Sequence, residues 1–368
     1  PNFLYITNLN IPNLFVIYIY STKELYFILD DNDDWGDNGD YIQMIYNIYG
    51  NNIKIHKIDK FNKIIDKNVL PIYSLNTMSF IKHKANNTDL NKYITGLRSI
   101  KNNNEINKIY IANKYTSMAI KHVLNNLLTT NYKYCYQIVN SIKCKLGYYN
   151  VIQQAYTPIC TVGSKNNILH SQSHIGELHE GSLILLDIGC RYKGYCADIT
   201  RTFPVNGHFT QLQKNIYNIV LLMQNMAFEL IGNNVNWYYV QQNCLILLYI
   251  KLIELKIIRN LDNSREDKLE IASMFMPHSL GHSVGIDVHD PARLVTLKNN
   301  MVLAIEPGIY FYKSQLENDA VDSSVWNNYM SIGGIRIEDV VVVKDEGVYN
   351  LTNLEKTVEE IEELMNNN

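Results

Sequence analysis

Two aspartates lie within a segment, residues 182–203, that is otherwise built mainly of apolar and β-forming residues. The polar turn in its middle predicts two antiparallel strands of a hairpin. If the hairpin centre lies between Tyr192 and Lys193, Asp187 faces Asp198 at a Cβ separation of about 4.5 to 5.5 Å, where like charges are destabilising. Such a pair needs a cation or a shared proton if the strands are buried, and neither if both side chains lie on a solvent edge.

A second segment, residues 275–290, contains three of the ten histidines of the chain, His278, His282 and His289. Imidazole is the commonest metal-ligating side chain and exchanges protons near pH 7. Two glycines in the same segment allow the backbone to approach a ligand closely. A single histidine here would more often be a core residue, but three within twelve residues favour a metal over a shared proton.

Two glutamates follow in apolar strand contexts, Glu306 and Glu338. A carboxylate is costly to bury without a partner or a metal. With the two aspartates and His282 they form a set too rich in oxygen for a structural zinc site, which prefers thiolates and imidazoles. The set suits two divalent ions such as Mn²⁺, with Co²⁺ or Zn²⁺ as substitutes. Two such ions, about 3.5 to 4 Å apart, can bridge a water and present hydroxide to a carbonyl carbon.

The composition narrows the range of partners. A net charge of −3 over 368 residues gives no polybasic field for nucleic acid or an anionic membrane. Apolar runs end well before the roughly 20 residues that a membrane span needs. Six cysteines without C-x-x-C spacing are typical of reduced thiols in a cytosolic protein, so we expect a cytoplasmic location.

The hydrophobic periodicity changes near residue 96 and predicts two domains. Short β-rich runs precede it, at residues 15–20, 24–29 and 52–58. They indicate a small α/β domain over residues 1–95, which we expect to be truncated at its start. Helical spacing follows, over residues 106–127, 210–231 and 237–258, with strand-like segments beyond residue 153. Residues 96–368 are therefore expected to form a second, α+β domain.

These residues and motifs resemble those of the pita-bread metallopeptidases and, within them, of eukaryotic-type prolidases. The most specific motifs are residues 275–282, 285–290 and 306–311, and the resemblance covers nearly the entire chain. It implies a curved antiparallel sheet with helices outside and two Mn²⁺ in its concave face, preceded by a smaller creatinase-like α/β domain. It also implies a homodimer.

The resemblance implies a role for each expected metal ligand. Asp187 would give two oxygens to one metal, while Asp198 and Glu338 would bridge both. His282 and Glu306 would complete the shell of the other metal. Glu306 would also accept a proton from the bridging water as it attacks.

Further residues resemble those that contact substrate. His278 and His289 resemble histidines that bind substrate and stabilise the tetrahedral intermediate. His170 resembles a histidine near the free carboxylate of the substrate, Tyr156 resembles a nearby pocket tyrosine, and Arg336 an arginine beside the site. All three are expected to bind substrate.

The expected activity is hydrolysis of the bond before a C-terminal proline in Xaa-Pro dipeptides, with no nucleic-acid or membrane partner. Arg293 either replaces the arginine that clamps the substrate carboxylate or lies free on the surface, because its loop is shorter than in the closest relatives. A pocket closed on that carboxylate by Arg293 or His170 favours dipeptides. The alternative is aminopeptidase P, which shares the five ligands and acts on longer peptides. A peptide-binding module without metals would have lost ligands, and none is lost here.

Overall fold

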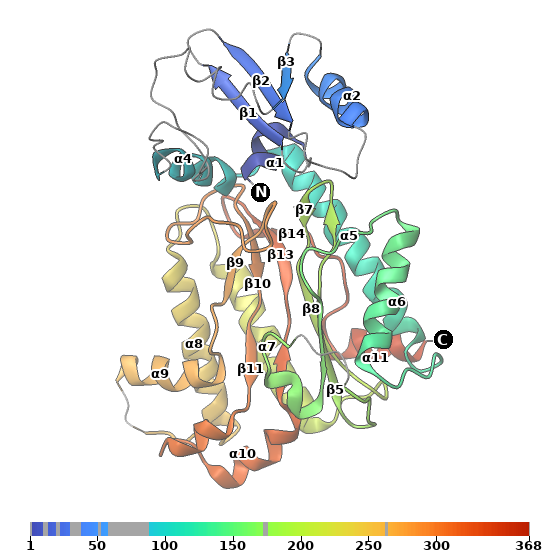
Figure 1. Ribbon diagram of the computed structural model, residues 1–368. Helices are drawn as coiled ribbons and strands as arrows, with labels where there is room; N and C mark the ends of the chain where they lie inside the picture. Colours follow the sequence, from blue (N-terminus) through green and yellow to red (C-terminus); the bar gives the residue numbers. More distant parts are fainter. Residues whose placement is uncertain are drawn as a thin grey trace. The chain divides into compact units, whose positions relative to one another are not determined.

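The chain is described by a computed structural model that separates into two compact units, Pro1–Gly96 and Leu97–Asn368 (Figure 1). The residues that it describes are 2–9, 14–19, 23–29, 38–50, 53–57, 88–171, 176–261 and 264–367. Each unit is considered by itself.

The first unit contains a three-stranded sheet. Strand β1 (Leu14–Ile19) pairs with β2 (Glu24–Leu29) antiparallel, and β2 pairs with β3 (Lys54–Lys57) in parallel. The helices α1 (Asn2–Thr7) and α2 (Asn38–Tyr49) belong to this unit, and α4 (Thr88–Ser99) leads into the second. The three strand predictions are confirmed. Residues 58–87, between β3 and α4, lie outside the described residues.

The second unit contains two main sheets, and its named strand pairs are all antiparallel within the described residues. One sheet has the order β4-β5-β8, with β4 at Ile159–Val162, β5 at Leu183–Ile188 and β8 at Ile199–Pro204. The other has the order β14-β13-β10-β9, with β9 at Gly281–Ser283, β10 at Val302–Ile305, β13 at Asp339–Val343 and β14 at Val348–Asn350. A bridge between Thr200 and Glu338 joins the two sheets.

Two smaller strand pairs complete the unit. The hairpin strands β6 (Arg191–Tyr192) and β7 (Tyr195–Cys196) extend the β5–β8 pair. Strand β11 (Gly308–Tyr310) pairs with β12 (Gly334–Arg336). Both connect segments that carry the expected site residues, so they help to set the geometry of the site.

The predicted helices over residues 106–127, 210–231 and 237–258 are confirmed as α5 (Asn103–Asn126), α7 (Gln211–Leu230) and α8 (Trp237–Glu254). Helix α5 begins with a capping box in which Asn102 and Glu105 satisfy each other's backbone N–H groups. The other α-helices are α6 (Cys135–Tyr148), α9 (Arg265–Phe275), α10 (Ser323–Tyr329) and α11 (Val358–Asn366). Helix α5 packs on α6 and on β7, and α7 packs on α8.

The hairpin of β5 and β8 has a different register from the predicted one. Asp187 pairs with Thr200 and does not face Asp198, so that prediction is wrong. The turn is centred on Lys193 and Gly194, whose φ angles are 46° and 87°. A two-residue type I′ turn needs positive φ at both central positions, which favours glycine at the second and shifts the pairing.

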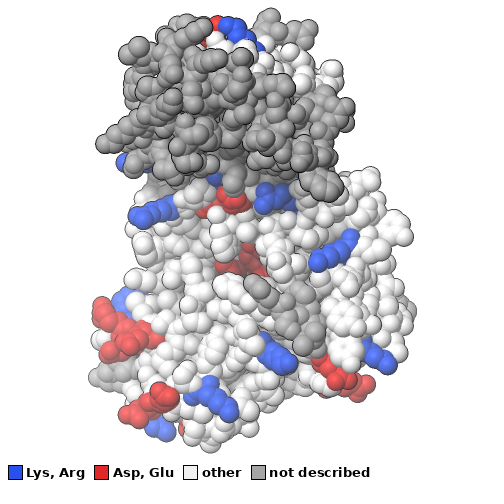
Figure 2. Space-filling view, in the orientation of Figure 1, with Lys and Arg blue, Asp and Glu red and all other residues white. Residues whose placement is uncertain are grey.

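The described surface carries charges of both signs. On the part of the face that is not grey in Figure 2, the side chains of lysine and arginine are interspersed with those of aspartate and glutamate. No helix among the described residues is both long and apolar enough to cross a membrane. All six cysteines are free thiols.

Candidate metal centre

The five expected metal ligands come from both main sheets of the second unit. Asp187 lies in β5, Asp198 directly before β8, His282 in the middle of β9, Glu306 directly after β10, and Glu338 between β12 and β13. The bridge that joins β8 to the segment before β13 brings the two sheets together at this point. Side chains far apart in the sequence therefore meet at one place.

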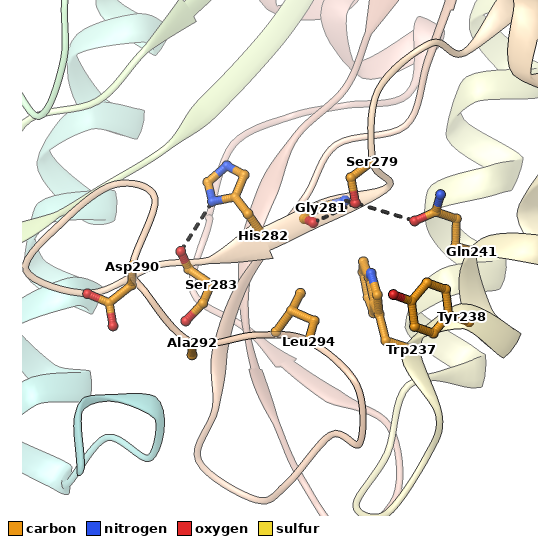
Figure 3. A pocket seen from close by; sticks show the side chains of 10 residues that line it. All are labelled: Trp237, Tyr238, Gln241, Ser279, Gly281, His282, Ser283, Asp290, Ala292 and Leu294. Carbon is orange, nitrogen blue, oxygen red and sulfur yellow. Dashed lines mark hydrogen bonds between the residues drawn. The ribbon is translucent and has the colours of Figure 1, made fainter. Parts of the chain in front are cut away.

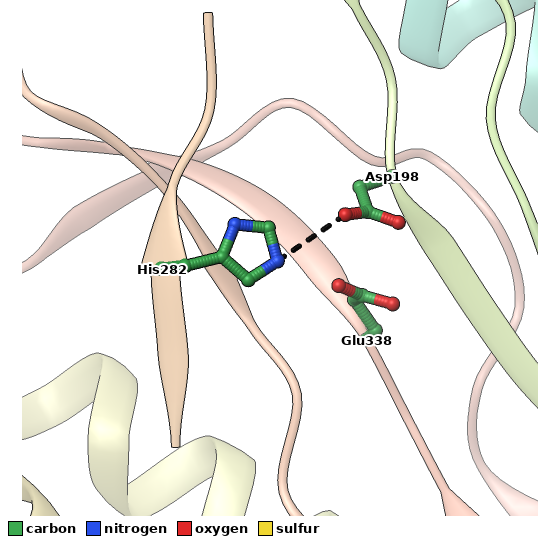
Figure 4. Close-up of side chains that lie close together, drawn as sticks. All are labelled: Asp198, His282 and Glu338. Carbon is green, nitrogen blue, oxygen red and sulfur yellow. Dashed lines mark ion pairs between the residues drawn. The ribbon is translucent and has the colours of Figure 1, made fainter. Parts of the chain in front are cut away.

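Three of these side chains form the tightest group (Figure 4). Asp198, His282 and Glu338 each offer one ligand atom, and these atoms all lie within 4.8 Å of one another. His282 Nε2 lies 3.4 Å from Asp198 Oδ2 and 3.6 Å from Glu306 Oε1. Asp198 and Glu338 are buried, whereas His282 and Glu306 are half-buried and accessible from the site.

Tyr156 ties Asp187 to this group. Its hydroxyl is within hydrogen-bonding distance of Asp187 Oδ1 and, at 2.6 Å, of Asp198 Oδ1. A phenol has one proton to donate, so Tyr156 can satisfy only one of the two carboxylates at a time. The sequence predicts a substrate-pocket role for Tyr156, whereas the structure places its hydroxyl between two expected metal ligands.

The electrostatics of the four carboxylates fit a divalent cation. Burial raises the pKa of Glu338 well above its usual value, and the neighbouring Asp198 and Glu306 raise it further. Burial likewise raises the pKa of Glu306 to about 7, with His282 opposing and the aspartates adding to the shift. Carboxylates crowded in this way repel one another, and a divalent ion, which prefers such oxygen donors, would offset that repulsion.

His282 responds to the same charges in the opposite sense. Burial lowers its pKa, but the hydrogen bond and charge of Asp198, together with Glu306, outweigh burial and raise the pKa to about 9. The protonated ring thus supplies positive charge inside the cluster. A metal bound there would displace that proton, because an imidazole ligand must be neutral.

A chain of hydrogen bonds leads away from Asp187 on the other side. Arg336 donates from Nη2 to Asp187 Oδ2 at 2.7 Å and from Nη1 to Tyr310 Oη at 3.0 Å. Tyr310 Oη lies 3.0 Å from His278 Nε2, and His278 Nδ1 lies 2.8 Å from the carbonyl oxygen of Ser279. A carbonyl can only accept, so Nδ1 carries the proton and Nε2 accepts from Tyr310. Burial, reinforced by Arg336, lowers the pKa of His278 to about 4.

Tyr310 was not singled out from the sequence. Its ring fits because two glycines flank it: a Cβ on Gly308 would lie 2.5 Å from Tyr310 Oη, and a Cβ on Gly334 would overlap the ring. Gly334 pairs directly with Tyr310 across β11 and β12. The readable signal was the Pro-Gly-Ile-Tyr order after Glu306, but only the strand pairing shows what the glycines leave room for.

The remaining expected substrate residues are exposed. The rings of His289 and His282 lie 4.2 Å apart between centroids. His170 is close enough that its charge lowers the pKa of both His278 and His289, after the larger effect of burial on each. Arg293, by contrast, has no hydrogen bond or ion pair to any described residue. The structure therefore gathers the histidines near the cluster.

The loop that carries His289 is held by buried ion pairs that sequence reasoning missed. Arg98 Nη2 lies 2.6 Å from Asp290 Oδ1 and 2.8 Å from Asp287 Oδ2. Lys101 Nζ lies 3.1 Å from Asp290 Oδ2, and both of these side chains are almost fully buried. The Asp290 carboxylate therefore anchors the end of the loop directly after His289.

A pocket of about 270 Å³ lies beside His282 (Figure 3). Trp237 and Tyr238, at the start of α8, line it together with Leu294 from the loop after Asp290. Its walls combine these apolar side chains with polar groups of the β9 segment. The pocket offers room for a peptide side chain next to the candidate metal centre.

The chain is similar in sequence to known metallopeptidases. The family model Peptidase_M24, metallopeptidase family M24, matches residues 107–345. A probable Xaa-Pro aminopeptidase of Aspergillus clavatus is 35% identical over 242 residues, 58% of this chain and 52% of that protein. One of Fusarium vanettenii is 28% identical over 407 residues, 99% of this chain and 87% of that protein. In the first of these matches, and in several like it, the chain spans about half the length of the curated relative.

Solved structures agree with the sequence relatives. The zinc-substituted aminopeptidase P of E. coli in complex with product has a TM-score of 0.81 at 26% sequence identity, covering 99% of this chain and 88% of that chain. The expected pita-bread catalytic domain with an N-terminal α/β region is thereby confirmed. The relatives are named aminopeptidase P, not prolidase, so their names favour the alternative considered from the sequence. The residues matched are more than half of the chain, which therefore belongs to metallopeptidase family M24.

Proposed function

We propose that this protein is a two-metal aminopeptidase P, which removes the N-terminal residue from peptides whose second residue is proline. The observation that carries the proposal is the convergence of Asp198, His282 and Glu338, whose ligand atoms lie within 4.8 Å of one another. The names of the relatives support the choice of substrate.

The metals would be held by five side chains. Asp187, Asp198 and Glu338 would bind one ion, and Asp198, His282, Glu306 and Glu338 the other, so that two carboxylates serve both. Mn²⁺ is the first candidate, with Co²⁺ or Zn²⁺ as substitutes, because carboxylates dominate the donor set. When bound, two such ions supply Lewis-acid polarisation of a peptide carbonyl and of water.

The protein's own groups would orient the peptide and move protons. Glu306 is half-buried beside His282, where its carboxylate can accept a proton from attacking water. His278 is neutral, and its hydrogen bond with Tyr310 fixes the ring. His289 is exposed beside His282 and can donate to a substrate carbonyl.

One feature favours longer peptides over dipeptides. The pocket beside His282 provides space for a further residue. Prolidase activity remains the second candidate, because it uses the same five ligands.

Substrate length separates the two candidates. Metal-free protein reconstituted with Mn²⁺ would be assayed with Ala-Pro and with Ala-Pro-Ala. We expect release of alanine from the tripeptide, with Pro-Ala as the second product. Cleavage of the dipeptide alone would instead establish a prolidase. The homodimer and the cytoplasmic location also stay proposals; light scattering of the purified chain tests the first.

A further inference from the structure

A buried arginine lies behind the candidate metal centre. Arg201 follows Thr200 in β8, and successive strand residues point to opposite faces. Thr200 donates its hydroxyl to Glu338 Oε2 at 2.7 Å on the site face. The Arg201 side chain therefore points to the reverse face, and the residue is 0% exposed.

All five N–H groups of this guanidinium have an acceptor. A guanidinium carries one N–H on Nε and two on each Nη. The acceptors are the carbonyl oxygens of Thr200 (2.9 Å) and Glu338 (2.8 Å) for Nη1, Asp339 Oδ1 (2.7 Å) and the carbonyl of Leu354 (2.9 Å) for Nη2, and the carbonyl of Glu355 (2.9 Å) for Nε. One side chain thus fixes the backbone on both sides of the bridge between the two sheets.

The network continues to a third ligand-bearing segment. Asp339 Oδ2 accepts from Lys356 Nζ at 2.8 Å, and Lys356 Nζ also donates to Gln224 Oε1 at 2.8 Å. Gln224 is buried in α7 and donates from Nε2 to the carbonyls of Ile305, at 3.1 Å, and Ile337, at 3.4 Å. These isoleucines directly precede Glu306 and Glu338, two of the expected metal ligands.

We infer that Arg201 and Gln224 are positioning residues that fix the spacing of the segments carrying Asp198, Glu306 and Glu338, and thereby the affinity of the metal centre. The inference rests on the proposed metal-dependent function. Carboxylates on these segments repel one another, so their backbones need restraint from the reverse face. Backbone carbonyls bound by buried side chains provide that restraint without occupying the site.

The alternative is a network that only stabilises the sheet. The test therefore reads metal affinity separately from stability, with calorimetric titration of Mn²⁺ into metal-free protein and thermal unfolding of the same samples. Gln224→Met keeps the volume and helix propensity but removes both donors to the carbonyls. Arg201→Lys keeps the charge but cannot reach five acceptors. Ile142→Ala, a cavity in helix α6, which carries none of the expected ligands, serves as the control for lost stability.

We expect Gln224→Met and Arg201→Lys to weaken Mn²⁺ binding by about 10- to 100-fold, the range for partners that orient metal ligands. Ile142→Ala should lower the melting temperature with wild-type affinity. If Arg201→Lys does not fold, Gln224→Met decides alone. Wild-type affinity in a folded Gln224→Met variant would overturn the inference.

The two proposals fail in different ways. A wild-type protein that binds Mn²⁺ but cleaves no Xaa-Pro peptide would reject the proposed function, while the affinities of the variants would still decide the role of the network. A wild-type protein that binds no Mn²⁺, Co²⁺ or Zn²⁺ would reject both.

Discussion

Replacement of Tyr310 by phenylalanine should separate the hydrogen-bond chain from the metal ligands. The Tyr310 hydroxyl accepts from Arg336 Nη1 and is bound to His278 Nε2, each at 3.0 Å. The phenylalanine ring would still fill the space left by Gly308 and Gly334. The variant therefore removes two hydrogen bonds without creating a large cavity.

The expected loss of stability and activity depends on the two groups that lose the Tyr310 hydroxyl as a hydrogen-bond partner. Arg336 is buried, so its Nη1 loses a partner that water does not easily replace, at a cost of about 1–3 kcal/mol. His278 is half-buried and can bind water at Nε2, which adds less to the loss of stability. Its ring would be held by the Ser279 carbonyl alone, and a general acid or base contributes about 10²- to 10⁴-fold to rate, so we expect kcat to fall by about 10- to 100-fold.

The assay compares kcat on Ala-Pro-Ala, Mn²⁺ content and thermal unfolding of the metal-free protein. Tyr312→Phe is the matched control, because the Tyr312 hydroxyl donates at 2.7 Å to the carbonyl of Asn167, outside the chain that ends at Asp187. Tyr310→Phe should lose activity with its metals in place, and the control should not. Wild-type kcat in Tyr310→Phe, or an equal loss in Tyr312→Phe, would refute the assigned role.

Three further predictions concern single side chains. Asp198→Asn should weaken Mn²⁺ binding by more than about 100-fold, which exceeds the loss of affinity expected for residues that only orient metal ligands. Tight Mn²⁺ binding by this variant in calorimetry would show that Asp198 is not a ligand. Neutral His278 contributes stability above its unfolded pKa of about 6.5, and this contribution is lost as the pH falls toward about 4. Over that range the melting temperature of metal-free His278→Gln should therefore fall less than that of the wild-type protein. An equal fall in both proteins would contradict the low pKa. Cys144 is exposed, whereas burial raises the pKa of Cys190 to about 11 and of Cys244 to about 12. A thiol reagent at pH 8 should therefore label Cys144 first, and Cys144→Ser should abolish the fast phase of labelling. A fast phase that persists in this variant would show another accessible thiol.

The long helices and the strands of the first unit could be predicted because their hydrophobic periods extend over many residues. Helix α10 has only 7 residues, too few for a period to stand out. Helix α11 was not predicted, although the capping box of Thr357 and Glu360 is a readable signal for its start. The hairpin register was predicted wrongly because the positive φ of Gly194 sets the position of the turn. A backbone angle is not visible in the hydrophobic pattern of the sequence.

The candidate ligands could be found because a carboxylate in an apolar strand is costly to bury and therefore conspicuous. Sequence patterns could not identify Tyr310, Arg201 and Gln224, because each acts through a contact that the local sequence does not contain. The bond from Arg201 to the Glu338 carbonyl joins residues 137 apart, and the bond from Gln224 to the Ile305 carbonyl joins residues 81 apart. Only the paired sheets bring these groups together.

The central claim is that the carboxylate cluster with His282 holds two divalent ions on which Xaa-Pro hydrolysis depends. Titration of metal-free protein with Mn²⁺, with binding and cleavage of Ala-Pro-Ala followed in the same samples, tests it most directly. We predict two Mn²⁺ per chain and activity that rises with their binding. Full activity in chelator-treated protein, or no saturable Mn²⁺ binding by folded protein, would contradict it.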